Sequence, residues 1–147
     1  MDAFVLDASV AVSWCFPDDP TKNTTFTQGV LDLLEEADAL VPEVWAYEIA
    51  NSIFVSHFRR KRIGEKQILR YVELLKSLPI LVAHSSCQEN VGLEKLARQF
   101  ELTAYDVSYL ALARQKGLSL ATANGKLANA AKAEGVELVA VKTDLQP

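Results

Sequence analysis

The sequence predicts a doubly wound α/β domain, in which helices cover both faces of a parallel sheet. Short apolar runs alternate with longer helical stretches along the chain, which is the pattern of βαβ units. The chain has 147 residues, enough for one domain that buries most of its apolar surface. No repeat, linker or low-complexity segment interrupts the pattern. We therefore expect residues 1–147 to form a single domain.

Five short apolar runs are the predicted strands. They comprise residues 4–6, 39–41, 80–83, 118–121 and 136–141. The first predicted helix is a short piece that follows the first strand. The other predicted helices comprise about residues 24–36, 43–61, 65–76, 86–100, 103–117 and 126–134. Strands and helices therefore alternate along most of the chain.

Individual residues mark where several of these helices begin and end. Pro42 suits the first turn of the helix that starts at residue 43, and Gly64 stops that helix. Ser86 and Glu89 have the spacing of a capping box, and Thr103 begins the next helix in a similar way. The helix boundaries thus agree with the strand pattern.

The composition argues against several classes of protein. Cys15 and Cys87 lack metal-ligand spacing, and His57 and His84 are isolated, so a zinc site is not expected. We expect both thiols to be free and buried. No apolar run is long enough to cross a bilayer, and the N-terminus lacks the basic region of a signal peptide. We therefore expect a cytoplasmic protein with no membrane contact.

Polar side chains follow two of the predicted strands. Asp7 comes directly after the first strand, and Thr122 and Asn124 come directly after the fourth. Ligands of such sheets bind beyond the carboxyl ends of the strands, so these residues should converge at one edge.

Two further acids lie in helices that are otherwise apolar. Glu48 interrupts one such helix, with Asn51 on the same face, and Asp106 lies in the first turn of another. A carboxylate in apolar surroundings is costly unless something pairs it, and neither helical segment supplies a Lys or Arg partner. Gathered carboxylates suit Mg²⁺ or Mn²⁺, which would activate a water and neutralise charge on a phosphodiester. This pattern indicates a metal-dependent phosphodiesterase.

Four segments in order resemble the PIN-domain ribonucleases, particularly the VapC-type toxins of bacterial toxin–antitoxin pairs. The segments are Val-Leu-Asp-Ala-Ser at residues 5–9, Trp-Ala-Tyr-Glu-Ile-Ala-Asn at 45–51, Thr-Ala-Tyr-Asp-Val-Ser-Tyr-Leu-Ala-Leu-Ala at 103–113, and Leu-Ala-Thr-Ala-Asn-Gly-Lys-Leu-Ala at 120–128. Each motif alone is weak, but four at suitable spacing cover nearly the whole chain.

The resemblance implies a three-layer α/β/α sandwich around a parallel sheet of about five strands. It places Asp7, Glu48 and Asp106 on the metal-binding, catalytic acids of the family. The polar positions that support such a site are Ser9, Asn51 and Thr122. It further implies cleavage of single-stranded RNA with Mg²⁺ or Mn²⁺, a homodimer, and a cognate antitoxin as partner.

One position departs from the family pattern. Asn124 stands where an acid is common, although some members have Asn there, and we expect it to belong to the catalytic set. An amide oxygen can bind a metal or hold a water but brings no negative charge. We therefore expect one well-formed metal site from three carboxylates and a weak second one.

Other interpretations of these residues stay open at this point. Asp7 could be a strand-end turn residue and Asp106 a helix acid favoured by the dipole, while Ser9 and Thr122 could be caps. An aspartyl-phosphate phosphatase would use Asp7 as nucleophile, but Ser9 stands where that chemistry usually wants a second acid. A PIN-like binding module with weakened catalysis and an RNA-processing nuclease are the remaining alternatives.

The sequence has one basic cluster, although its net charge is −4. Arg and Lys occupy residues 59–62, with Lys66 and Arg70 beyond. The cluster could bind RNA phosphates. It could equally stabilise the C-terminus of a helix by interacting with the helix dipole, or form a solvated face. The aromatic residues nearby, Phe54 and Phe58, are expected in the core with Trp14 and Trp45 rather than as platforms for base stacking.

Overall fold

The four strands of the protein form one parallel sheet. The computed structural model describes residues 1–141. The strands are β1 (Ala3–Leu6), β2 (Asp38–Pro42), β3 (Ile80–Ala83) and β4 (Leu120–Ala121). They lie in the order β3-β2-β1-β4, with every neighbouring pair parallel. The predicted α/β class and parallel sheet are confirmed.

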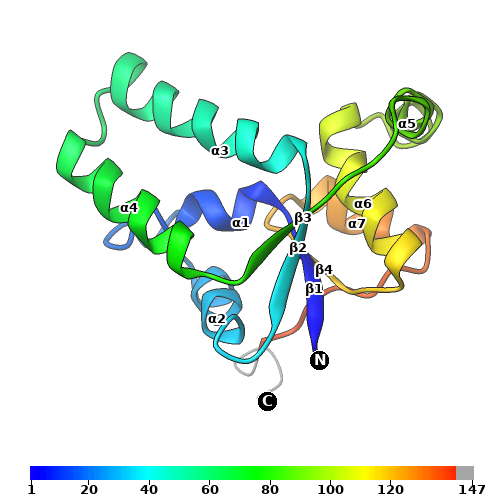
Figure 1. The fold of residues 1–147 in the computed structure, drawn as a ribbon, viewed down its shortest axis with the longest axis horizontal. Coiled ribbons are helices and arrows are strands. Elements are labelled where there is room, and N and C mark those ends of the chain that lie inside the picture. Colours follow the sequence, from blue (N-terminus) through cyan, green and yellow to red (C-terminus); the bar gives the residue numbers. More distant parts are fainter. Residues whose placement is uncertain (142–147) are drawn as a thin grey trace.

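Helices cover both faces of the sheet and complete the three layers (Figure 1). One layer contains α1 (Ala8–Ser13), α2 (Thr25–Leu33), α3 (Val44–Phe54) and α4 (Glu65–Ser77). The other contains α5 (Cys87–Phe100), α6 (Ala104–Lys116) and α7 (Gly125–Ala133). The predicted cap at Ser86 forms a full capping box with Glu89, and Thr103 caps α6.

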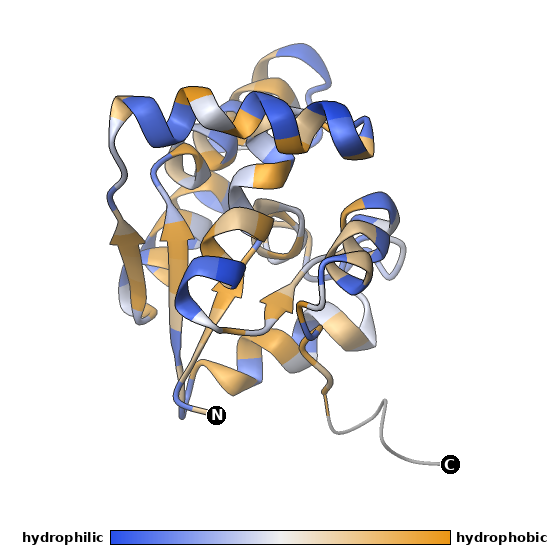
Figure 2. Cartoon of the chain, turned by 90° about the vertical axis from the view of Figure 1, so that its right-hand side faces the viewer, coloured by the Kyte–Doolittle hydropathy of each residue, from blue (hydrophilic) through white to orange (hydrophobic). Residues whose placement is uncertain are grey.

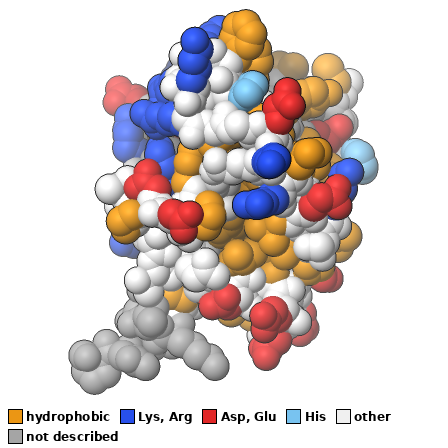
Figure 3. Space-filling view, turned by 90° about the vertical axis from the view of Figure 1, so that its left-hand side faces the viewer, with side chains coloured by type: hydrophobic (Ala, Val, Ile, Leu, Met, Phe, Trp, Pro, Cys, Tyr) orange, Lys and Arg blue, Asp and Glu red, His pale blue; other side chains and the backbone are white. Residues whose placement is uncertain are grey.

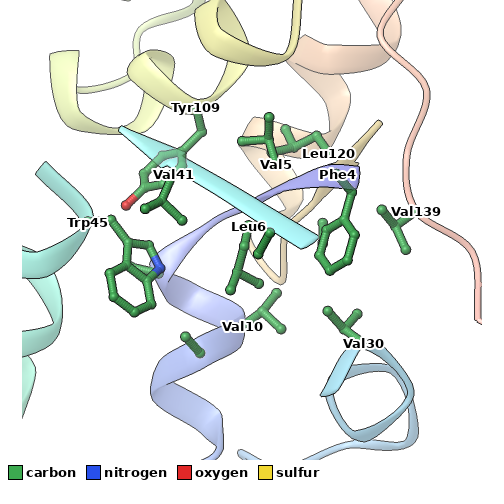
Figure 4. Close-up of a cluster of buried hydrophobic side chains, with 14 of the residues drawn as sticks. Phe4, Val5, Leu6, Val10, Val30, Val41, Trp45, Tyr109, Leu120 and Val139 are labelled. Atoms are coloured by element: carbon green, nitrogen blue, oxygen red, sulfur yellow. The ribbon is translucent and has the colours of Figure 1, made fainter. Parts of the chain in front are cut away.

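Strands β1 and β4 consist entirely of apolar residues, as expected for strands covered by helices on both faces (Figure 2). Phe4, Val5 and Leu6 of β1 are fully buried, as is Leu120 of β4. Side chains from α1, α2 and α6 close over them, among them the fully buried Tyr109 (Figure 4). This core fixes the ends of β1 and β4, from which candidate site residues extend.

The register of β1 and β4 decides where the chain leaves the sheet. Leu6 pairs with Ala121, and the Asp7 amide donates a hydrogen bond to the Ala121 carbonyl at 2.9 Å. Asp7 and Thr122 therefore leave the sheet side by side, as expected for the carboxyl ends of adjacent parallel strands.

The predicted fifth strand at residues 136–141 is wrong for the part of the chain that the structure describes. Leu138 forms only an isolated parallel bridge with Leu120. The neighbouring strand, β4, is two residues long, so it offers little ladder to extend, and Gly135 turns the chain at φ +74° just before this segment. The sheet thus has four strands rather than about five.

The helix predicted over residues 43–61 also differs. The α-helix ends at Phe54 and continues as η1 (Val55–Arg59), a short π-helix in which the Arg60 amide donates to the Val55 carbonyl at 3.0 Å. No residue of η1 is buried, and Lys61 then takes a left-handed φ of 52°. The helix therefore ends before Gly64 is reached.

Two expectations about side-chain burial are corrected. Trp14 and Trp45 are buried as expected, but Phe54 and Phe58 are 47% and 69% exposed. Both cysteines are free, but only Cys15 is buried, because Cys87 begins α5, a helix with no buried residue. Among residues 1–141, no helix is both long and apolar enough to cross a membrane.

Candidate active site

Asp7 is a buried carboxylate at the carboxyl end of β1, with 3% of its surface exposed. It stands at the N-cap position of α1, yet its side chain does not cap that helix. Instead its Oδ2 accepts hydrogen bonds from Ser9 Oγ at 2.6 Å and from Thr122 Oγ1 at 2.7 Å. The two hydroxyls therefore orient the Asp7 carboxylate.

Backbone amides of the segment after β4 hold these two hydroxyls in turn. The Ala123 amide donates to Ser9 Oγ at 3.0 Å, and the Asn124 amide donates to Thr122 Oγ1 at 3.0 Å. Each hydroxyl accepts a hydrogen bond from a backbone amide and donates one to the Asp7 carboxylate. The carboxylate is thus fixed by a network that begins in rigid backbone, and Ser9 and Thr122 act on Asp7 rather than as helix caps.

Asn124 is the N-cap of α7. Its Oδ1 accepts from the amides of Lys126 and Leu127 at 3.0 and 3.3 Å. The side chain still lines the same pocket as Asp7. Because its amide oxygen already accepts two hydrogen bonds in capping, Asn124 has little capacity left to bind a metal in this conformation.

Glu48 reaches the site from α3 and is half-buried. Its Oε1 accepts a 2.5 Å hydrogen bond from the hydroxyl of Tyr109, a residue of α6 that is fully buried. Burial raises the pKa of the Tyr109 hydroxyl above its usual range, and the neighbouring Glu48 raises it further. The tyrosine therefore stays protonated and donates to Glu48.

Asp106 lies in the first turn of α6, where its amide donates a hydrogen bond to Oγ1 of the N-cap residue Thr103 at 3.1 Å. Its side chain is half-buried and lines the same pocket as Asp7 and Glu48. The helix therefore presents this carboxylate toward the other two acids.

The three carboxylates interact electrostatically. Burial raises the pKa of Asp7, against the lowering effect of the two hydroxyls, and the charge of Asp106 raises it further. Burial also raises the pKa of Glu48, against the hydrogen bond from Tyr109, and the charges of Asp7 and Asp106 add to the rise. Among the described residues, no Lys or Arg forms an ion pair with any of the three. Negative charge therefore accumulates here without a cation from the protein.

An open pocket of about 330 Å³ brings the predicted residues together. Its polar lining residues are Asp7, Ser9, Glu48, Asn51, Ser52, Asp106 and Asn124. Thr122 is the one predicted site residue that does not line the pocket, and its hydroxyl donates a hydrogen bond to Asp7. Sequence reasoning placed Tyr109 among apolar residues and missed its role. The signal was available, since a buried tyrosine hydroxyl needs a partner and Tyr109 lies one helical turn after Asp106.

The side chains of this pocket suit a hard divalent cation. Carboxylate oxygens are the ligands that Mg²⁺ and Mn²⁺ prefer, and an uncompensated group of them attracts positive charge. No three Asp, Glu, His or Cys side chains in residues 1–141 are already arranged to hold a metal ion. The chemistry of the donor atoms fits the ion, but the carboxylates would have to move closer together to bind it.

Tyr109→Phe tests the contact that holds Glu48. We expect the substitution to lower the free energy of unfolding by about 1–2 kcal/mol, because hydrogen bonds to charged groups contribute about 1.5–3 kcal/mol and water replaces part of this one. Urea unfolding measures the loss. Tyr105→Phe, on an exposed ring of the same helix, serves as control. In a Glu48→Ala background the cost of Tyr109→Phe should shrink, and an unchanged cost would show that the hydroxyl does not act through Glu48.

Comparison with known protein families identifies the family of this chain. The model of the PIN domain matches residues 4–133, most of the chain. The chain belongs to the PIN-domain family. PIN domains are typically nucleases, and the family assignment expected from the four sequence segments is confirmed.

Solved structures agree with this fold. The chain is similar to PAE2754 from Pyrobaculum aerophilum at 20% identity, with a TM-score of 0.67 over 97% of this chain and 91% of that one. It is similar to VapC20 of Mycobacterium tuberculosis, a toxin that cleaves the sarcin–ricin loop, at 17% identity, with a TM-score of 0.62 over 86% of this chain and 94% of that one. Comparison with curated proteins gives no match. At these identities the likeness establishes the PIN fold.

Proposed function

We propose that this PIN domain is a divalent-metal-dependent endoribonuclease and the toxin of a toxin–antitoxin pair. The observation that carries the proposal is the shared pocket of Asp7, Glu48 and Asp106, three coupled carboxylates with no cationic partner in the described chain. Membership of the PIN family supports nuclease chemistry. The fold shared with VapC20 supports RNA as substrate, an antitoxin as partner and a role as toxin.

The residues of the pocket have distinct tasks in this proposal. Asp7, Glu48 and Asp106 would hold Mg²⁺ or Mn²⁺, which when bound lowers the pKa of a water and offsets phosphodiester charge. Ser9 and Thr122 keep Asp7 in one orientation through their hydrogen bonds to Oδ2. Tyr109 does the same for Glu48. Asn51 is exposed at the pocket and offers its amide to the RNA backbone.

Cleavage of a mixed RNA pool tests the activity. We expect the purified chain to cut RNA with Mg²⁺ or Mn²⁺ and to stop when a chelator is added. Cutting that survives chelation would overturn the mechanism. Growth arrest on expression, relieved by a small neighbouring gene product, would support the toxin, whereas an RNA-processing nuclease should leave growth unaffected. In this proposal residues 1–147 act as one nuclease domain in the cytoplasm, as a homodimer.

Asn124→Asp should tighten the binding of Mn²⁺ about tenfold, since one added charge near a divalent ion contributes on the order of 1.4 kcal/mol even at high dielectric. Asp caps helices as well as Asn does, so α7 should stay intact. Isothermal titration with MnCl₂ measures the affinity. Asn129→Asp makes the same charge change on an exposed part of α7 and should have a smaller effect. Equal affinities for the two variants would show that Asn124 does not face the ion.

A further inference from the structure

Three exposed aromatic side chains lie on one face of α3 and η1. Tyr47, Phe54 and Phe58 are 77%, 47% and 69% exposed. Large aromatic side chains are normally buried, so three on one short segment indicate a binding surface. We call Tyr47, Phe54 and Phe58 the aromatic stripe.

The aromatic stripe leads away from the candidate active site. Tyr47, Asn51, Phe54 and Phe58 are spaced by four, three and four residues, which places them on one side of the helix. Trp45 and Ile49 are the buried residues of α3 and occupy its opposite side. Asn51 lines the pocket that holds the three carboxylates. The stripe and the pocket therefore form one continuous surface along α3.

The rings at the far end of the stripe are arranged as a platform. Phe54 and Phe58 stack with centroids 5.3 Å apart and planes 12° from parallel. The Arg59 guanidinium lies over the Phe54 ring at 5.7 Å from its centroid. Stacked rings with a guanidinium beside them suit flat, electron-rich ligands such as nucleobases.

The chain turns basic where the stripe ends. Arg59, Arg60, Lys61 and Arg62 follow directly and are exposed, in a protein whose net charge is −4. None of these four cations takes part in an ion pair within residues 1–141. Lys and Arg side chains gather beside exposed hydrophobic ones on this end of the molecule (Figure 3). Clustered cations that form no ion pair in the described residues, at one end of an acidic protein, fit a polyanion better than an apolar protein surface.

We propose that single-stranded RNA lies along α3 and η1, with an unpaired base stacked on Phe58, whose ring Phe54 supports, and phosphates on residues 59–62. The inference rests on the proposed ribonuclease function and adds which surface of the chain binds the substrate. Stacking requires bases that are free to leave a helix, so this surface selects unpaired RNA over duplex. Asn51 lies between the platform and the carboxylates, so a strand held here continues into the pocket.

Phe58→Ala tests the platform in the full chain, with fluorescence anisotropy of a labelled, unstructured oligoadenylate in the presence of EDTA. We expect Kd to rise about 5- to 100-fold for this probe, which is the range of losses for one base–aromatic stack, and to change little for a duplex probe. Phe58→Trp should keep tight binding because it keeps a flat ring, whereas Phe58→Leu should bind as weakly as the Ala variant. Val91→Ala, which truncates an exposed apolar side chain on α5, is the matched control.

Arg60→Ala should weaken single-stranded and duplex probes alike and reduce the salt slope of binding by about one. Equal Kd values for wild type and Phe58→Ala would overturn the inference. So would a shift of Phe58→Ala from dimer to monomer in sedimentation, because the stripe would then be a contact between copies of this chain. RNA binding is measured without metal. If the wild type binds RNA through Phe58 but does not cleave it when metal is added, only the proposed function is overturned. If the wild type cleaves RNA but Phe58→Ala binds it as tightly as the wild type does, only this inference is overturned.

Discussion

Asp7→Asn is expected to lower kcat for metal-dependent RNA cleavage by about a thousandfold or more. The substitution removes the most buried of the three carboxylates but keeps an oxygen that accepts from Ser9 and Thr122. Stabilisation of transition-state charge by a bound cation is worth several kcal/mol, and each ~1.4 kcal/mol is tenfold in rate. Single-turnover cleavage in Mg²⁺ or Mn²⁺ measures the effect.

The same variant should be at least as stable as the wild type when metal is chelated. Burial raises the pKa of Asp7, so its ionised form costs folding free energy above that pKa, and a neutral amide relieves the cost. Each 1 kcal/mol corresponds to roughly 2–4 °C of Tm for a domain of about this size. The gain should narrow as the pH falls toward the unfolded-state pKa of an Asp, about 3.9, because the wild type is then protonated too.

Added metal should make the wild type the more stable of the two proteins, because an ion that binds only the wild type raises only the wild-type Tm. Asp2→Asn removes an exposed carboxylate near the start of β1 and should leave cleavage unchanged. Wild-type cleavage rates in Asp7→Asn, with its fold intact, would exclude Asp7 from the metal site.

The strand pattern and helix caps in the sequence predicted most of the fold because each depends on local chemistry. Ser86 and Thr103 cap the helices they were expected to cap, since a hydroxyl at an N-cap needs only the next turn of backbone. The segment at residues 136–141 failed as a strand because pairing depends on its neighbour, and β4 is only two residues long. The length of a neighbouring strand is a tertiary property that an apolar run does not report.

The acids of the candidate site and the hydroxyl partners of Asp7 were predictable from the sequence, but the partner of Glu48 was missed. Asp7 and Thr122 follow adjacent parallel strands, so topology alone brings them together. The hydrogen bond from Tyr109 to Glu48 joins α6 to α3 across 61 residues, and apolar periodicity gives no sign of it. Phe54 and Phe58 were expected in the core because their spacing matches a buried helix face. That periodicity is the same for an exposed face, and only the packing of α3 shows which face is exposed.

The hydroxyls of Ser9 and Thr122, which donate to Asp7, should matter to catalysis although neither needs to contact a metal. We expect Thr122→Val and Ser9→Ala each to lower metal affinity or kcat/KM about 10- to 100-fold, the usual loss when a partner of a metal ligand is removed. Each substitution frees Oδ2 of Asp7 from one of its two hydroxyl donors. Thr122→Ser keeps the hydroxyl and should retain most activity, and Ser77→Ala, at an exposed hydroxyl on α4, is the control.

The double variant Ser9→Ala with Thr122→Val should lose less than the product of the single losses, because both hydroxyls orient the same carboxylate and act as one network. Cleavage kinetics and Mn²⁺ titration, with the Tm of each variant measured alongside, separate this effect from a loss of folding. If Thr122→Val and Thr122→Ser were equally active, the hydroxyl of Thr122 would have no part in placing Asp7. Strictly multiplicative losses would mean that Ser9 and Thr122 act independently, and the pathway from the backbone amides of Ala123 and Asn124 to Asp7 would then not be a single unit.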